Sequence, residues 1–309
     1  MSGMKVRGIL GDEPEDDKDI VILNRRLVWK ADALEYEADP KHVWLIAEAL
    51  GLNGVSNGLE MPIAREEKDH EKCDEEKLDK TKATQYRAIA ARANYLAQDR
   101  FDIQFAAKQI CREMSSPTVG SWRRLKRLGR YLLQYPTVTW RFEKNVGIEG
   151  AILDTFTDSD WAGCTRSRRS TSAGLVVVNG CLVKSWSSTQ STIALSSGEA
   201  EYYAAVKAAA EALAIQRVAA ELGWQLGIRI WIDSSAAKSI SSRIGIGKVR
   251  HLEVKYLWLQ DALKAKRFEM RKIHGRANPS DIGTKPVNAA AIREALSRFC
   301  KIQRRQERQ

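Results

Sequence analysis

The order of the elements predicted between residues 152 and 232 constrains the fold of this chain more than any other feature. Apolar alternation predicts strands at Ile152–Thr157, Ser172–Val178, Cys181–Ser187 and Ile228–Ile232. The second and third strands flank Asn179-Gly180, a pair typical of two-residue hairpin turns. A long Ala-rich helix separates the third and fourth strands, opened by a capping box of Ser196 and Glu199 and ended by Gly223. This order indicates an α/β domain.

The flanking segments add elements on both sides. Strands are expected at Ile20–Leu23, Leu27–Trp29, Leu34–Glu37, Thr137–Phe142 and Phe268–Ile273. Helices are expected from Asp39-Pro40 to Leu50, from Thr81 to Leu96, at Ile103–Met114, after a cap at Ser116-Pro117, around Leu252–Leu263, and at Asn288–Phe299. With 309 residues, the chain is long enough for two domains.

Several classes of protein are excluded by composition. No apolar run reaches the ~18 residues of a membrane span, and Met1–Leu10 lacks the apolar stretch of a secretory signal. The five cysteines and four histidines show no metal-ligand spacing, so reduced thiols are favoured over disulfides or zinc. We therefore expect an intracellular protein without a membrane partner.

Charge is divided unevenly along the chain. Residues 1–80 hold 12 Lys/Arg and 20 Asp/Glu, whereas residues 81–309 hold 38 and 19. The basic portion suits a polyanionic partner, although charge that only keeps a protein soluble gives the same composition. The helix after Ser116-Pro117 carries Arg123, Arg124 and Arg127 on one face, which suits either phosphate contacts or simple solvation.

Four carboxylates stand out by their places in this pattern. Asp158 and Asp233 each follow a predicted strand, Glu201 lies early in the long helix, and Asp281 follows Asn278-Pro279-Ser280. Taken singly, each has an ordinary explanation as a strand-end residue, a partner of the helix dipole or a helix N-cap. Together they have a chemical reason, because hard divalent cations prefer carboxylate oxygens and two cations about 3.5–4 Å apart can cleave a phosphodiester.

Seven ordered motifs in this region resemble the ribonuclease H domain of copia-type LTR retrotransposon Pol polyproteins. They are Phe156-Thr157-Asp158-Ser159-Asp160-Trp161-Ala162-Gly163, Arg169-Ser170-Thr171-Ser172-Ala173-Gly174, Ser185-Trp186-Ser187-Ser188, Ala194-Leu195-Ser196-Ser197-Gly198-Glu199-Ala200-Glu201-Tyr202, Ile232-Asp233-Ser234-Ser235-Ala236-Ala237, Arg250-His251-Leu252-Glu253 and Ala277-Asn278-Pro279-Ser280-Asp281-Ile282-Gly283-Thr284-Lys285-Pro286. The resemblance implies a ribonuclease H-like fold: a mixed five-stranded sheet flanked by helices.

The same resemblance assigns roles to residues. It implies that Asp158, Glu201, Asp233 and Asp281 are catalytic ligands of two Mg²⁺ ions, for which Mn²⁺ could substitute. Glu201 is preferred to Glu199 because Glu201-Tyr202-Tyr203-Ala204-Ala205 matches the helix segment that carries the ligand. Asp160 ranks below Asp158 because it lies one step beyond the expected strand end. His274 resembles a mobile histidine that assists product or proton release, and a role for His251 is left open.

The upstream part resembles neighbouring regions of the same polyproteins. Tyr95-Leu96, Asp99-Arg100-Phe101-Asp102-Ile103, Ser116-Pro117-Thr118 and Arg130-Tyr131-Leu132-Leu133 are similar to the segment that joins reverse transcriptase to ribonuclease H, although Phe101 replaces the usual proline. The expected division is a disordered tail (1–18), a remnant of the reverse transcriptase C-terminal region (19–80), a helical connection (81–146), a ribonuclease H-like domain (151–300) and a basic tail (301–309). The part that precedes the ribonuclease H-like domain is expected to be a smaller α+β thumb and connection region.

The resemblance implies an enzyme that hydrolyses the RNA strand of RNA–DNA hybrids. No Tyr-x-Asp-Asp sequence occurs, so no polymerase activity is expected, and the chain is interpreted as a C-terminal fragment or a truncated copy. Lys248 and Arg250, with Arg123, Arg124 and Arg127, are expected to contact phosphates. The rest of the reverse transcriptase is a candidate partner. A retrotransposon particle in the cytoplasm is the expected location, with a nuclear presence left open.

Two other functions remain open from the sequence. One is a catalytically inactive copy of the same fold that binds nucleic acid as a structural module. The other is an integrase-like strand-transfer enzyme, which would have a glutamate as its late acid. Asp281 stands in that place and favours ribonuclease H.

Overall fold

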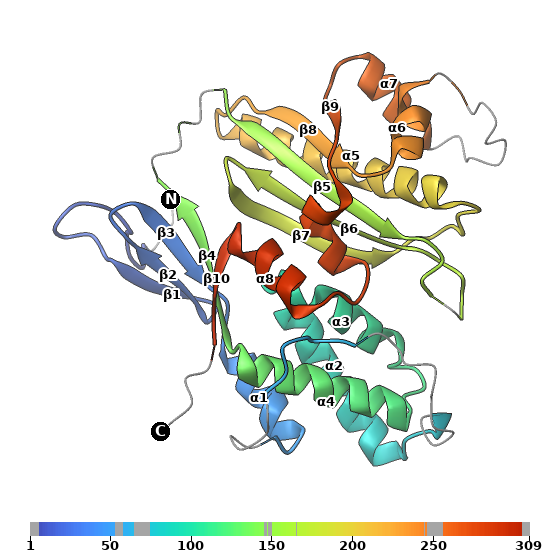
Figure 1. Cartoon of the computed structure of the whole chain (residues 1–309). Helices are drawn as coiled ribbons and strands as arrows, with labels where there is room; N and C mark the ends of the chain where they lie inside the picture. Colours follow the sequence, from blue (N-terminus) through green and yellow to red (C-terminus); the bar gives the residue numbers. More distant parts are fainter. Residues whose placement is uncertain are drawn as a thin grey trace, which may run out of the picture.

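A computed structural model of the chain describes residues 6–52, 58–64, 75–144, 147, 150–164, 166–243, 245 and 256–304. Within these ranges the fold is mixed α/β, with two five-stranded sheets and helices packed around them (Figure 1). None of the helices in these ranges is long and apolar enough to cross a membrane.

The first sheet is antiparallel throughout and has the order β1-β2-β3-β4-β10. Its strands are β1 (Asp19–Ile22), β2 (Arg25–Trp29), β3 (Ala33–Glu37), β4 (Thr137–Glu143) and β10 (Cys300–Gln303). The first four agree with the strands expected from the sequence. The fifth was not predicted: residues 301–303, expected in a basic tail, extend along β4 and return the end of the chain to this sheet.

The second sheet is mixed and has the order β7-β6-β5-β8-β9. Its strands are β5 (Ile152–Asp160), β6 (Thr171–Val178), β7 (Cys181–Thr189), β8 (Gly227–Ile232) and β9 (Glu269–Lys272). β5 runs parallel to β8, and β8 parallel to β9, whereas β6 is antiparallel to both of its neighbours. Asn179 and Gly180 both have positive φ (48° and 83°), as the turn between β6 and β7 requires.

Eight α-helices and two short 3₁₀ helices lie in the described ranges. They are α1 (Lys41–Ala49), α2 (Lys80–Leu96), α3 (Phe101–Arg112), α4 (Val119–Gln134), α5 (Ser197–Glu221), α6 (Ser235–Ser242), α7 (Trp258–Lys264), α8 (Ala289–Ser297), η3 (Gly275–Ala277) and η4 (Pro279–Gly283). The cap of α4 differs from the expected Ser116-Pro117. Thr118 and Ser121 bond each other's backbone N–H in a capping box, so the helix begins two residues later than expected.

Three apolar cores hold these elements together. One lies between α5 and the second sheet, and another lies inside the bundle of α1, α2, α3 and α4. The third joins the first sheet to the second, because Val138 and Trp140 of β4 pack in one cluster with Leu175 and Val177 of β6. The two sheets therefore share an apolar core, to which η4 and α8 also contribute side chains.

Candidate metal centre and the adjoining basic groove

Asp158 lies inside β5, not after it. The sequence placed the strand end at Thr157, but β5 continues to Asp160 because its ladder with β6 includes Asp158↔Ala173, Ser159↔Ser172 and Asp160↔Thr171. The Asp158 side chain is 2% exposed, and its Oδ2 accepts a hydrogen bond from the Thr284 hydroxyl. A carboxylate is tolerated in this strand because its polar partners come from a different element.

Asp233 reaches the same place from the neighbouring strand. β8 ends at Ile232, and Phe156 of β5 is paired with Trp231 of β8 in parallel register. The carboxyl ends of parallel strands meet at one edge of a sheet, so Asp233 comes close to Asp158. The next residue, Ser234, caps α6 through a bond from the Ala237 N–H.

Glu201 is contributed by α5, which packs against β5. Its Oε1 accepts hydrogen bonds from the N–H and the hydroxyl of Ser159, at 3.1 and 3.2 Å. Its Oε2 is buried without a hydrogen-bond partner. Glu199 is used differently, because its carboxylate accepts bonds from the Leu195 N–H and the Tyr203 hydroxyl. Glu199 therefore fixes the start of α5.

These three acids form one compact group. Each of Asp158, Glu201 and Asp233 offers a carboxylate oxygen within 4.8 Å of the others. Within the described ranges this is the one cluster of at least three His, Cys, Asp or Glu residues with such spacing, and Asp160 is not a member. β5 and α5 each contribute one of these carboxylates, and the third comes directly after β8.

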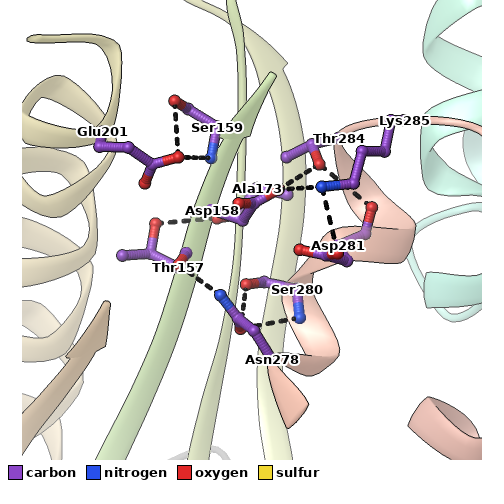
Figure 2. A network of polar contacts seen from close by, with 10 residues as sticks. All are labelled: Thr157, Asp158, Ser159, Ala173, Glu201, Asn278, Ser280, Asp281, Thr284 and Lys285. Atoms are coloured by element: carbon purple, nitrogen blue, oxygen red, sulfur yellow. Dashed lines mark hydrogen bonds and ion pairs between the residues drawn. The ribbon is translucent and has the colours of Figure 1, made fainter. Parts of the chain in front are cut away.

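Asp281 is linked to Asp158 by an ion pair that both carboxylates form with Lys285. Lys285 Nζ lies 3.1 Å from Asp281 Oδ2 and 3.8 Å from Asp158 Oδ2, so its ammonium stands between the two carboxylates (Figure 2). Asp281 Oδ1 is buried and has no hydrogen-bond partner. The fourth predicted ligand therefore adjoins the group of three and is not part of it.

The turn that carries Asp281 is fixed firmly to the second sheet. Asn278 caps η4 by accepting from the Ser280 N–H, and its own Nδ2 donates to the Thr157 carbonyl of β5 at 2.9 Å (Figure 2). Gly283 allows the close approach, because a Cβ there would lie 2.6 Å from the Cβ of Ala173. These contacts therefore fix the positions of Asp281 and Lys285 relative to β5.

Burial makes these carboxylates poor anions without a counter-charge. Desolvation raises the pKa of Asp158, and the nearby Asp281 carboxylate raises it further. Desolvation likewise raises the pKa of Glu201, with smaller contributions from Asp158 and Asp233, and burial followed by Asp281 raises the pKa of Asp233. Clustered carboxylates with raised pKa values are stabilised by a cation.

The residues present fit a divalent metal. The donor set is all carboxylate, as hard cations prefer, and Glu201 is 8% exposed with an oxygen that no protein group satisfies. Asp158, Glu201 and Asp233 would hold one ion, and Asp281 with Asp158 could contribute to a second. Nothing in the donor set distinguishes Mg²⁺ from other hard divalent cations.

The other predicted residues are spread more widely. His274 is exposed and directly precedes Gly275. A Cβ at Gly275 would lie 3.3 Å from Asp233 Oδ2, so the backbone at Gly275 passes beside the metal centre. Arg123 is exposed, while Arg124 and Arg127 are half-buried on α4. Lys248, Arg250 and His251 lie outside the described residues.

A groove of about 980 Å³ adjoins the metal centre, because Asp281 and Lys285 belong to its lining. Arg127 of α4, Arg276 and Arg298 line the same groove, together with Glu294 and apolar side chains. We call it the basic groove. It brings one of the arginines predicted to contact phosphates into the same cavity as Asp281, and no local pattern indicated that Arg276 and Arg298 would join it.

Sequence reasoning also missed three residues at the centre. Ser159 holds Glu201, Thr284 bonds Asp158, and Lys285 separates Asp158 from Asp281. One signal was available, because Lys285 follows Asp281 by four residues, a spacing at which opposite charges meet on a helical turn. No local pattern indicated its contact with Asp158, 127 positions earlier.

Sequence comparisons show which known proteins the chain resembles. No family model matches the chain. The chain is 38% identical over 129 residues to an uncharacterised mitochondrial protein of Arabidopsis thaliana, which covers 41% of the chain and 52% of that protein. It is 37% identical over 126 residues to a secreted RxLR effector protein of Plasmopara viticola, covering 87% of that protein and 41% of the chain.

Three further matches are retrovirus-related Pol polyproteins from plant transposons. The polyprotein of transposon RE2 from Arabidopsis thaliana is 29% identical over 213 residues, or 68% of the chain and 14% of the polyprotein. The chain spans about half the length of the mitochondrial protein (52%) and 14% of the length of the RE2 polyprotein. These matches show that the chain corresponds in sequence to one region of copia-type retrotransposon Pol polyproteins.

Proposed function

We propose that this chain is a ribonuclease H that cuts the RNA strand of RNA–DNA hybrids. The observation that carries the proposal is the meeting of Asp158, Glu201 and Asp233 within 4.8 Å, at the carboxyl ends of β5 and β8. The strand order β7-β6-β5-β8-β9, with α5 against β5, is the mixed five-stranded sheet that the sequence resemblance implied for a ribonuclease H-like fold.

The residues of the chain would each have a defined task. Asp158, Glu201 and Asp233 bind cations, and Ser159 orients Glu201 by two hydrogen bonds. Two divalent cations held by the four acids would supply the charge that activates a water molecule and stabilises the leaving 3′ oxygen. Asn278 and Thr284 hold η4 against β5 and so keep Asp281 beside Asp158.

The basic groove is the proposed path of the nucleic acid. Arg127, Arg276 and Arg298 line it and would contact backbone phosphates, which position a strand without reading its sequence. The RNA strand would be distinguished by its 2′-hydroxyl groups and by the wide minor groove of the hybrid. We propose the remainder of the reverse transcriptase as a partner and a cytoplasmic retrotransposon particle as the location.

Cleavage of a labelled RNA–DNA hybrid in Mg²⁺ or Mn²⁺ tests this function. We expect cutting of the RNA strand alone, none of single-stranded RNA or duplex DNA, and none in EDTA.

Asp233→Asn should reduce cleavage at least about 10³-fold and leave hybrid binding within about twofold, since it removes a ligand charge without changing the side-chain size. Full activity of Asp233→Asn would refute the site. Tight binding without cleavage by the wild-type chain would favour a catalytically inactive binding module.

A further inference from the structure

Lys285 occupies an unusual position for a lysine beside a candidate metal centre. Its Nζ lies 3.1 Å from Asp281 Oδ2 and 3.8 Å from Asp158 Oδ2, and its side chain is 38% exposed (Figure 2). A cation already stands between two of the four predicted ligands. In the part of the chain that the structure describes, Lys285 is the cation paired with Asp158, and no ion pair involves Glu201 or Asp233.

The position of Lys285 is built into the turn. The Lys285 N–H donates to the Asp281 carbonyl, and the preceding Thr284 is fully buried and bonds both Asp158 Oδ2 and the Asp281 carbonyl. Asn278 fixes the other end of η4 to β5. The lysine backbone is therefore anchored, while its four-carbon side chain has a partly exposed face through which it can move.

Charge requires that something neutralise this pair of acids. Asp158 is almost completely buried, and Asp281 Oδ1 is buried with no hydrogen-bond partner. An ammonium and a divalent cation cannot share the space between two carboxylates, because like charges a few ångströms apart repel strongly away from bulk water. Either cation can satisfy the pair, and each excludes the other.

We propose that Lys285 is a built-in counter-cation that competes with a divalent metal for the Asp158–Asp281 pair. This inference rests on the proposed function, because it assumes that the four acids bind cations. One cation then binds the triad of Asp158, Glu201 and Asp233, where the lysine pairs with Asp158 alone. A second binds between Asp158 and Asp281 only when the lysine ammonium moves out, so its affinity is lower and the lysine sets the metal concentration that the site needs.

Binding of Mn²⁺ to the full-length chain, followed by calorimetry at fixed pH and ionic strength without nucleic acid, tests the proposal. The wild-type chain should bind Mn²⁺ in two steps, the second weaker. Lys285→Met, which keeps an unbranched side chain and removes the charge, should tighten the second step about tenfold or more and leave the first within about threefold. Lys285→Arg should keep the second step weak, and Lys285→Gln repeats the test if the methionine variant does not fold.

Lys184→Met is the matched control. Lys184 lies in β7, in the same sheet as Asp158, but it pairs with Glu211 of α5. Removal of its charge should therefore change neither step of Mn²⁺ binding. Melting temperature gives a second readout. In EDTA, Lys285→Met should melt below the wild type, because two carboxylates then face each other without a cation, and saturating Mn²⁺ should remove the difference.

The results separate this inference from the proposed function. An unchanged or weaker second step in Lys285→Met would overturn the role of Lys285, while hybrid cleavage by the wild type would still support the enzyme. The absence of any Mn²⁺ binding by the wild type would overturn both.

Discussion

At the scale of residues, the carboxylates of the candidate metal centre differ from their structural neighbours in the hydrogen bonds that they accept from the protein. Glu199 and Glu201 are two positions apart on α5 and both buried, yet they have opposite uses. Both oxygens of Glu199 accept hydrogen bonds from the protein, whereas one oxygen of Glu201 accepts none. An unsatisfied buried oxygen costs free energy unless a ligand binds it. Glu201 is therefore suited to a cation and Glu199 to a structural task.

This difference predicts opposite effects of the same substitution. Glu201→Gln should lower cleavage of the hybrid at least about 10²-fold without lowering stability, because it removes a ligand charge from a desolvated site. Glu199→Gln should retain cleavage within about threefold and lose about 1–2 kcal/mol of stability, since it weakens the start of α5. The paired measurements are initial cleavage rates and chemical denaturation. Loss of activity in Glu199→Gln alone would contradict the assignment.

At the scale of elements, a buried ion pair joins α3 to α4. Arg100, at the start of α3, is fully buried and donates to both oxygens of Asp102 at 2.9 and 2.7 Å. The Tyr131 hydroxyl of α4 also donates to Asp102, and Arg100 donates to the Tyr135 carbonyl at the end of that helix. Directly after Arg100, Phe101 packs near Gly283 of η4. The pair therefore links the helical bundle to the turn that carries Asp281.

Breaking this pair should be costly. Asp102→Ala leaves a buried guanidinium without its carboxylate, so we expect a loss of about 3–5 kcal/mol in the free energy of unfolding, measured by urea denaturation. The control is Glu113→Ala, which breaks the exposed pair with Arg166 and should cost less than about 1 kcal/mol. Similar stabilities for the two variants would show that the buried pair does not organise these helices.

At the scale of the whole molecule, the two sheets are tied together twice. The third apolar core contains residues of β4, β6, η4 and α8, and β10 returns the end of the chain to the first sheet beside β4. The basic groove is lined both by Arg127 of α4 and by Arg276 and Arg298 of the C-terminal segment. A nucleic acid in the groove would contact both parts of the molecule.

This arrangement predicts a binding affinity that depends on salt and on both sides of the groove. The logarithm of the hybrid association constant should fall linearly with the logarithm of salt concentration, because phosphate contacts release counterions. Arg127→Ala and Arg276→Ala should each reduce the slope by about one unit. Arg26→Ala, which removes an arginine paired with Asp19 in the first sheet, serves as the control and should leave the slope unchanged. A flat salt response in the wild type would remove the basic groove from the proposed path.

Local sequence patterns were sufficient to predict those elements of the fold that depend on neighbouring residues. Apolar alternation located the strands of the second sheet, Asn179-Gly180 located its hairpin, and Ser196 and Gly223 bracketed α5 closely. From the sequence, Asp158 and Asp233 would meet only if their strands were parallel neighbours, and the pairing of β5 with β8 fulfils that condition. These signals are local, or concern consecutive elements, and so can be read along the chain.

Contacts between residues that are distant in the sequence could not be predicted from local patterns and are known from the fold. β10 becomes a strand because β4 offers an unpaired edge, although its four residues carry no strong pattern of their own. β5 extends past Thr157 because β6 continues to pair with it. Lys285 stands between Asp281 and Asp158 because η4 is fixed to β5 by Asn278 and Thr284. The physical reason is that strand edges, buried charges and their partners are satisfied across the fold, where sequence separation carries no information about distance.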